Sequence, residues 1–213
     1  MHDIISIYAD SPETDDLTDK QLKIFKSAIE LFAKNGYANT STKEIATNAG
    51  VSEGSIFKKF KNKEDLLFSI LNPFLRNILP KVVNEFTEET LQTNYDTLTD
   101  FVSSILKNRN MFFKENVNAL KIFVDEFVYD LKIRDKMIKA IPYQYMKSFN
   151  DQVNSFKKRK MIVDWTNSEI FRFIFATLFG YLAEHYFIFE SLKWDEDLEM
   201  DHTIEFVVKG LQP

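Results

Sequence analysis

The sequence has no cysteine, and this absence excludes disulfide bonds, thiolate catalysis and zinc–cysteine sites. Only five glycines and five prolines occur in 213 residues, a composition that favours an all-helical fold. The three histidines, His2, His185 and His202, lack metal-ligand spacing, so we expect no metal site. Glycine-rich phosphate loops, dinucleotide-binding motifs and serine-nucleophile motifs are also missing, and nothing in the sequence predicts an enzyme or a cofactor.

Charge is unevenly distributed along the chain, whose formal net charge is −5. Residues 1–17 carry five acids and no base, whereas residues 18–70 carry nine lysines and six acids, a net charge of +3. The basic region is therefore the candidate for binding a polyanion. Because the acidic start of the chain is not followed by an apolar run, we expect no signal peptide and a cytoplasmic protein. Residues 1–16 are predicted to form a flexible acidic extension.

Residues 41–60 predict two short helices joined by a tight turn. Ser41 and Glu44 have the spacing of a capping box, which places a helix start just after Ser41. Gly50 ends this helix, because glycine readily adopts the left-handed conformation that follows many helices. Ser52 is the next N-cap. This arrangement is typical of a helix-turn-helix that docks on DNA.

The flanking segments complete a small helical module. Thr18 and Gln21 form a second capping box, and Gly36 marks the end of the helix that begins there. Asn62 caps the helix that follows the predicted pair. Residues 17–71 are therefore predicted to form one domain, and residues 72–213 a second.

The segment 17–67 resembles the N-terminal DNA-binding domain of the TetR family of bacterial transcription regulators. The residues that carry the resemblance are Ala28, Leu31, Phe32, Gly36, Tyr37, Ser41, Thr42, Ile45, Ala46, Ala49, Gly50, Val51, Ser52, Gly54, Ser55, Ile56, Phe57, Phe60, Lys63, Glu64 and Leu67. The rest of the chain is similar to the family only in its length and helical character.

The resemblance implies which residues contact DNA: Ser41, Thr42, Lys43, Ser52, Glu53, Gly54, Ser55, Phe57, Lys58, Lys59 and Lys63. Lys63 matches a lysine that holds a backbone phosphate in the family. The family usually has tyrosine where Phe57 stands, and phenylalanine lacks the hydroxyl that can bond a phosphate. An aromatic residue or histidine is common where Lys59 stands. Despite these departures the resemblance still implies DNA binding, but it does not imply which operator sequence is bound.

Residues 72–213 are predicted to form five or six further helices, giving about nine in all. Pro73 is expected to kink or end the helix that begins near Lys63. Sixteen of the 21 phenylalanines follow residue 70, and most must fill a core. An aromatic-rich helical bundle can also enclose a pocket for an apolar or aromatic small molecule, in agreement with the inducer-binding domains that the resemblance implies. Its candidate lining residues are Phe112, Phe113, Phe123, Phe127, Tyr145, Phe149, Phe175 and Phe179.

Residues 170–189 are long and apolar enough to suggest a transmembrane helix, but Arg172, Glu184 and His185 interrupt them, so no membrane contact is expected. A helix that is apolar on all sides must be buried on all sides. We therefore expect core on one side and a second copy of the chain on the other. The resemblance likewise implies a homodimer, in which the last two helices pair across a two-fold axis. The predicted interface residues are Phe171, Phe175, Leu178, Leu182, His185, Phe189, Ile204, Val207, Val208 and Leu211.

The expected function is that of a cytoplasmic, homodimeric repressor that binds double-stranded operator DNA and is released by a small-molecule inducer. Pro73 is the candidate pivot between the ligand pocket and the DNA-binding head. Two alternatives stay open. One is a TetR-like DNA-binding protein that acts through a protein partner. The other is a helical small-molecule binder or enzyme with a vestigial DNA-binding head.

Overall fold

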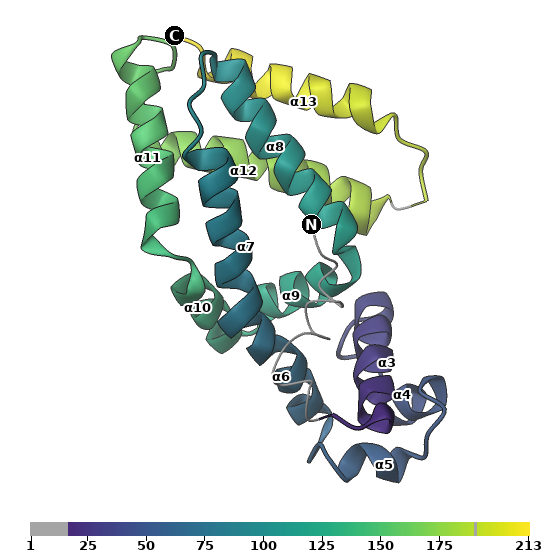
Figure 1. Cartoon of the computed structure of the whole chain (residues 1–213). Helices are drawn as coiled ribbons and strands as arrows, with labels where there is room; N and C mark the ends of the chain where they lie inside the picture. The colour runs from purple at the N-terminus through teal and green to yellow at the C-terminus, as the bar shows by residue number, and fades with distance from the viewer. Residues whose placement is uncertain (1–16, 190) are drawn as a thin grey trace. The chain divides into compact units, whose positions relative to one another are not determined.

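The structure is a computed structural model that describes residues 17–189 and 191–213, and the chain folds into helices joined by loops (Figure 1). The all-helical prediction is confirmed, with no strand among the described residues. The predicted extension, residues 1–16, lies outside the described residues. Contacts divide the chain into two compact units. The first unit contains the residues up to Val82 and Glu115–Ile141, and the second contains Val83–Lys114 and Pro142–Pro213.

The first unit begins with helices whose ends match the predicted caps. Helix α3, Asp19–Asn35, begins after the Thr18–Gln21 capping box, and the Gly36 amide donates to the carbonyl of Phe32 at its end. Helix α4, Thr42–Asn48, begins after the Ser41–Glu44 capping box, and the short helix α5 spans Glu53–Phe57. The two capping boxes are local in sequence, which is why the pattern of residues predicts them correctly. Ser52 lies at the N-cap position of α5, but its hydroxyl lies 2.9 Å from that of Ser55 and makes no capping bond.

A long helical segment follows and runs through Pro73 and Pro80. It comprises α6 (Lys63–Pro73), the π-helical turn η1 (Phe74–Ile78), α7 (Leu79–Phe86) and the π-helical turn η2 (Thr87–Leu91). Pro73 does not end the helix. Proline lacks the N–H that would bond the preceding turn, and the chain continues as a wider π turn directly after it. The segment belongs to the first unit up to Val82 and to the second from Val83.

Two later helices belong to the first unit, namely α9 (Val117–Tyr129) and α10 (Leu131–Ala140). Helix α9 packs against α3, and the Phe123 ring stacks on the Phe74 ring at a centroid distance of 3.7 Å. The division by contacts therefore differs from the predicted boundary after residue 71. A boundary at one point of the sequence cannot describe this division, because α9 and α10 come later in the chain and still belong to the unit that contains the helix-turn-helix.

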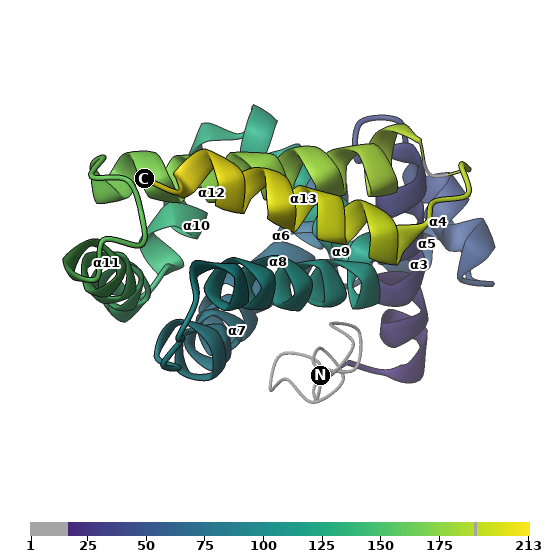
Figure 2. The same ribbon diagram turned by 90° about the horizontal axis from the view of Figure 1, so that it is seen from above.

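The second unit consists of α8 (Leu98–Glu115, up to Lys114), α11 (Tyr143–Lys158), α12 (Asn167–Ala183), the π-helical turn η3 (Glu184–Ile188) and α13 (Glu196–Leu211), together with the end of the long segment. Phe101, Phe149 and Phe156 are fully buried in its core. Each such ring contributes about 1.5–3 kcal/mol to folding. Helices α12 and α13 run side by side (Figure 2).

One described helix, Lys63–Leu91, is long and apolar enough to cross a membrane by length and composition alone. Half of its most apolar window is buried within the protein, as in the core helix of a globular fold. The apolar segment 170–189 is divided between α12 and η3.

Candidate nucleic-acid interface and ligand-binding residues

The helix-turn-helix is held by short, local hydrogen bonds. The Ser41 amide donates to Glu44 Oε2 at 2.7 Å, and the Glu44 amide donates to Ser41 Oγ at 3.2 Å. The Ser41 amide and the Ser41 hydroxyl both donate to the Glu44 carboxylate, and they hold its pKa below the ordinary value. Gly50 has a φ of 67°, the left-handed conformation predicted for it. The Thr42 hydroxyl donates to Glu53 Oε1 at 2.6 Å, so the two helices are also joined directly.

Polar contacts between distant residues, which the sequence pattern does not reveal, hold α4 against α3. The Ser27 hydroxyl donates to the carbonyl of Ile45 at 2.9 Å, and Asn48 Nδ2 donates to Ser27 Oγ and Glu30 Oε2 at 3.1 Å each. Thr40 is buried, and its hydroxyl bonds carbonyl oxygens at the end of α3. Ser27 and Thr40 orient the motif from buried positions, whereas Asn48 and Glu30 meet at the surface. Their partners lie up to 21 residues away, beyond the reach of a local motif.

The outer side of α5 and the residues after it carry the predicted recognition residues. Ile56 and Phe60 are buried, whereas Phe57 is 48% exposed and Lys58 and Lys59 are exposed. Lys43 and Gly54 are also exposed, and a Cβ added at Gly54 would meet no atom within 4 Å. Of the remaining predicted contacts, Ser41, Ser52 and Glu53 are exposed, and Thr42 and Ser55 are partly buried. The surface thus places lysine charge, which can neutralise phosphates, beside an exposed aromatic ring.

Lys63 has a structural role in this conformation. Its ammonium group donates to the carbonyl oxygens of Tyr37 at 2.8 Å and Thr40 at 2.9 Å, reaches that of Ala38 at 3.5 Å, and lies 4.2 Å from the centre of the Tyr37 ring. An ammonium group has three donors, and all three are directed at this loop. The structure therefore places Lys63 as an anchor of the loop before α4.

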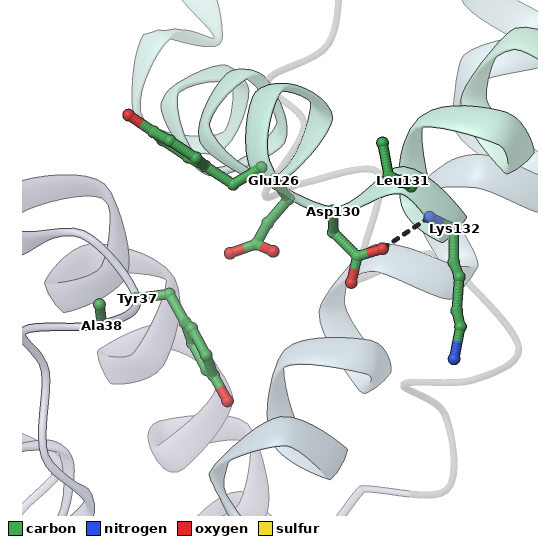
Figure 3. Close-up of a pocket in the computed structure, with 7 residues that line it drawn as sticks. Tyr37, Ala38, Glu126, Asp130, Leu131 and Lys132 are labelled. Carbon is green, nitrogen blue, oxygen red and sulfur yellow. Dashed lines mark hydrogen bonds between the residues drawn. The ribbon is translucent and has the colours of Figure 1, made fainter.

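An open recess of about 550 Å³ lies in the first unit, between the loop after α3 and the junction of α9 with α10 (Figure 3). In Figure 3 the Glu126 carboxylate and the Tyr37 ring lie on facing sides of this recess. Burial, followed by Glu64 and Glu126, raises the pKa of Tyr37. Asp130 accepts from the Lys132 amide at 2.7 Å and so caps α10. No pattern in the sequence brought these residues together.

The predicted pocket residues do not form one group. Tyr145, Phe149 and Phe175 share an aromatic cluster in the second unit, with ring centroids 6.4 Å apart for both Tyr145–Phe175 and Phe149–Phe175. Phe123 and Phe127 belong to the first unit. The other three belong to the second unit: Phe112 is buried, Phe113 packs against the rings of Tyr186 and Phe187, and Phe179 is exposed. Aromatic composition indicated a cluster but not which rings meet.

Tyr181 Oη and His185 Nε2 are buried in the second unit and have no hydrogen-bond partner among the described residues. The two rings stack at 3.9 Å, and His185 Nδ1 lies 2.8 Å from the carbonyl oxygen of Tyr181. His185 lies in the π-helical turn η3, and such turns are frequent at functional sites. Among the described residues, no group of three or more His, Cys, Asp or Glu side chains could hold a metal ion.

Most predicted interface residues are packed within the chain itself. Phe189 is exposed, Phe171 and Phe175 are partly buried, and the remaining seven are buried: Leu178, Leu182, His185, Ile204, Val207, Val208 and Leu211. Other apolar side chains of these helices face outward instead, among them Phe173, Phe179 and Phe206. Seven of the ten predicted interface residues thus face the core of the single chain, and the interface itself stays a prediction.

Residues 24–70 match the family model of the bacterial regulatory proteins of the tetR family. The transcriptional regulator YvkB of Bacillus subtilis is 24% identical over 193 residues, which cover 89% of this chain and 95% of YvkB. The family model, the regulators that the chain resembles and the solved structures together support a TetR-family transcriptional regulator. The same findings support a DNA-binding transcriptional regulator, and the predicted motif, residues 41–60, lies within the matched segment.

Two further comparisons cover different shares of the chain. The regulator QacR of Staphylococcus aureus is 48% identical over 50 residues, which are 24% of this chain and 27% of QacR. The crystal structure of FadR from Bacillus subtilis in complex with stearoyl-CoA has a TM-score of 0.61 at 20% identity, covering 89% of this chain and 98% of FadR. The first similarity is confined to a short segment, and the second shows a shared fold.

Proposed function

We propose that this protein is a transcriptional repressor that binds its operator as a homodimer and leaves it when a small molecule binds the second unit. The observation that carries the proposal is the helix-turn-helix itself, with its capped helices and its exposed Phe57, Lys58 and Lys59. Similarity to the TetR family supports the same function.

The DNA contact proposed here uses the two lysines for phosphates and the Phe57 ring for the sugar-phosphate backbone or a base edge. Because both lysines are exposed and release counterions when they neutralise phosphates, binding should weaken steeply with salt. Lys63 supports this surface by holding the loop before α4 rather than by contacting a phosphate in the free protein.

The homodimer proposed here buries the outward faces of α12 and α13. On α13, Leu198, His202 and Phe206 recur every four residues and are all exposed, and Phe173 and Phe179 are exposed on α12. A stripe of this kind on two adjacent helices is costly to leave in water and suits a symmetric helical interface. Pairing would set the two recognition helices at half-sites about 34–36 Å apart.

The ligand is proposed to be an apolar or aromatic small molecule held by the aromatic cluster of the second unit. A complex of FadR with stearoyl-CoA, a molecule with a long apolar chain, is consistent with this class of ligand. The segment Lys63–Leu91 enters both units, so a ligand that binds one helix packing better than another can shift the dimer between two states. Pro73, with the π turn directly after it, is the proposed pivot.

Binding of the full chain to DNA from its own promoter region, measured by fluorescence anisotropy at two salt concentrations with competitor DNA, tests the proposal. We expect a site-specific complex that weakens with salt and is lost in Lys58→Ala/Lys59→Ala. The control Lys158→Ala/Lys193→Ala removes two exposed lysines from the second unit and should bind as the unmodified protein does.

The other outcomes separate the alternatives. Salt-sensitive binding without sequence preference favours a DNA-binding protein that acts through a protein partner. A folded protein that binds no DNA at low salt refutes the repressor and points to a small-molecule binder or an enzyme with a vestigial head.

A further inference from the structure

Arg109 on α8 is a partly buried cation whose pKa the Glu89 carboxylate raises without forming an ion pair with it. Its guanidinium carbon lies 4.0 Å from the centre of the Phe86 ring and 5.0 Å from that of Phe112. Nε and Nη2 both donate to the same acceptor, Asn108 Oδ1, at 3.0 and 2.6 Å. Among the described residues, no carboxylate lies within 4 Å of it. A guanidinium group has five N–H donors, so three have no acceptor among the described residues.

This environment is unusual for an arginine. Burial lowers the pKa of Arg109 to about 10, partly offset by Tyr145 and Glu89, so the side chain stays charged at neutral pH. Charged groups are seldom desolvated unless they are paired. Arg159 in the same unit offers a comparison, since its guanidinium carbon lies 4.4 Å from the Phe156 ring centre. Arg159 remains exposed and donates to the carbonyl of Asp96 at 3.2 Å.

Tyr145 on α11 adds a second polar group beside Arg109. Its hydroxyl makes no hydrogen bond with the described residues, and burial raises its pKa well above the ordinary value while Arg109 lowers it. Its ring centroid lies 6.0 Å from that of Phe86, which Arg109 covers, and 6.2 Å from that of Phe171. A neutral hydroxyl and a guanidinium group are both donors to an anion.

An apolar surface continues from these two groups. Phe171 and Phe175 on α12 stack on each other at 4.2 Å, and both contact the Tyr145 ring edge-on. Arg109, Tyr145, Phe171 and Phe175 all keep some exposure to solvent. A molecule with a charged head and an apolar tail could therefore reach the cation and the rings together.

We propose that Arg109 and Tyr145 form an anion subsite that binds the acidic head of an amphipathic inducer, whose apolar tail lies against Phe171 and Phe175. This proposal rests on the ligand-released repressor proposed above and specifies the chemical class of the ligand. The head is a carboxylate or a phosphate, because both accept two parallel N–H donors from one guanidinium group.

Isothermal titration calorimetry of the full chain with dodecanoate, dodecyl phosphate and dodecanol tests this class. The three probes share one tail and differ only in the head. We expect the acids to bind roughly 10- to 150-fold more tightly than the alcohol, the range of a hydrogen bond to a charged group. Whichever of dodecanoate and dodecyl phosphate binds more tightly identifies the head group.

Arg109→Gln should remove the preference for acids and leave dodecanol binding unchanged, whereas Arg159→Gln should change neither. Tyr145→Phe should weaken acid binding by a smaller factor. Should Arg109→Gln fail to fold by circular dichroism, Arg109→Lys replaces it, because lysine keeps the charge but loses the fork that holds two oxygens. Equal affinity for acids and alcohol, no binding of any probe, or an acid preference that survives the Arg109 substitution overturns the proposal.

Operator binding is measured in parallel so that the two proposals can fail separately. A protein that binds its operator but does not discriminate the acids keeps the repressor and loses the anion subsite. A protein that binds the acids through Arg109 but never forms a specific DNA complex keeps the subsite and loses the repressor.

Discussion

Phe206 is the residue whose truncation tests the proposed dimer most directly. It lies on α13 and is 70% exposed in the single chain, so its replacement by alanine removes little from the core. If the outward faces of α12 and α13 pair across a two-fold axis, each copy buries its Phe206 in the interface. The substitution then weakens association without unfolding the subunit.

The magnitude follows from the exposed fraction. Complete burial of a phenylalanine side chain contributes about 1.5–3 kcal/mol. With 70% of the side chain still exposed, the remaining burial is worth about 1–2 kcal/mol per copy. Two-fold symmetry doubles this to about 2–4 kcal/mol, so Phe206→Ala should raise the dimer dissociation constant roughly 30- to 900-fold.

Sedimentation equilibrium over a range of protein concentrations measures that constant. The control is Tyr143→Ala, which removes a side chain that is 82% exposed on α11, away from the proposed interface helices, and should leave the constant unchanged. Thermal unfolding by circular dichroism verifies that both variants fold. A dimer that Phe206→Ala leaves intact, or that Tyr143→Ala weakens equally, refutes the assigned interface.

Three further predictions concern single groups. Tyr181→Phe removes a buried hydroxyl that has no hydrogen-bond partner among the described residues, so it should raise the free energy of unfolding by about 1 kcal/mol in denaturant titrations. Tyr186→Phe removes the hydrogen bond to Asn110 and should lower the free energy of unfolding by a similar amount. Equal losses in the two variants would contradict this prediction. Burial, and after it Glu196, raises the pKa of Tyr186 from 10.0 to about 12. The contribution of the Tyr186 hydroxyl to the free energy of unfolding is therefore complete below pH 10 and is lost as the pH rises toward 12. Alkaline denaturation of Tyr186→Phe should therefore be less steep over that range. Pro73→Ala should change the ligand concentration that releases the operator, measured by anisotropy, but not the ligand-free affinity; unchanged release would remove Pro73 from the mechanism.

The sequence by itself determined the ends of the helices around the DNA-binding motif. Ser41 with Glu44, Thr18 with Gln21 and the left-handed Gly50 each act within a few residues, so their spacing along the chain is also their spacing in space. The exposed Lys58 and Lys59 follow for the same reason, because burial of Ile56 and Phe60 fixes the helix face. The motif, the all-helical class and the family were therefore accessible from residue order alone.

Only the tertiary structure decided the contacts between distant segments. Lys63 bonds carbonyls 23 to 26 residues away, and α9 packs on α3 within the unit that holds the motif. Residue spacing carries no information about such contacts, which depend on how whole helices pack.

The same limit explains why the predicted interface and pocket residues are distributed differently in the structure. Apolar residues surround α12, so the hydrophobic pattern shows that the helix is covered without showing which neighbour covers which face. Packing against α13 and the rest of the second unit selects Leu178 and Leu182 for the core and leaves Phe179 outside. No sequence pattern singles out Arg109, because the rings that cover its guanidinium group belong to Phe86, 23 residues before it, and Phe112, three residues after it. Periodicity identifies apolar surface, and only packing assigns it a partner.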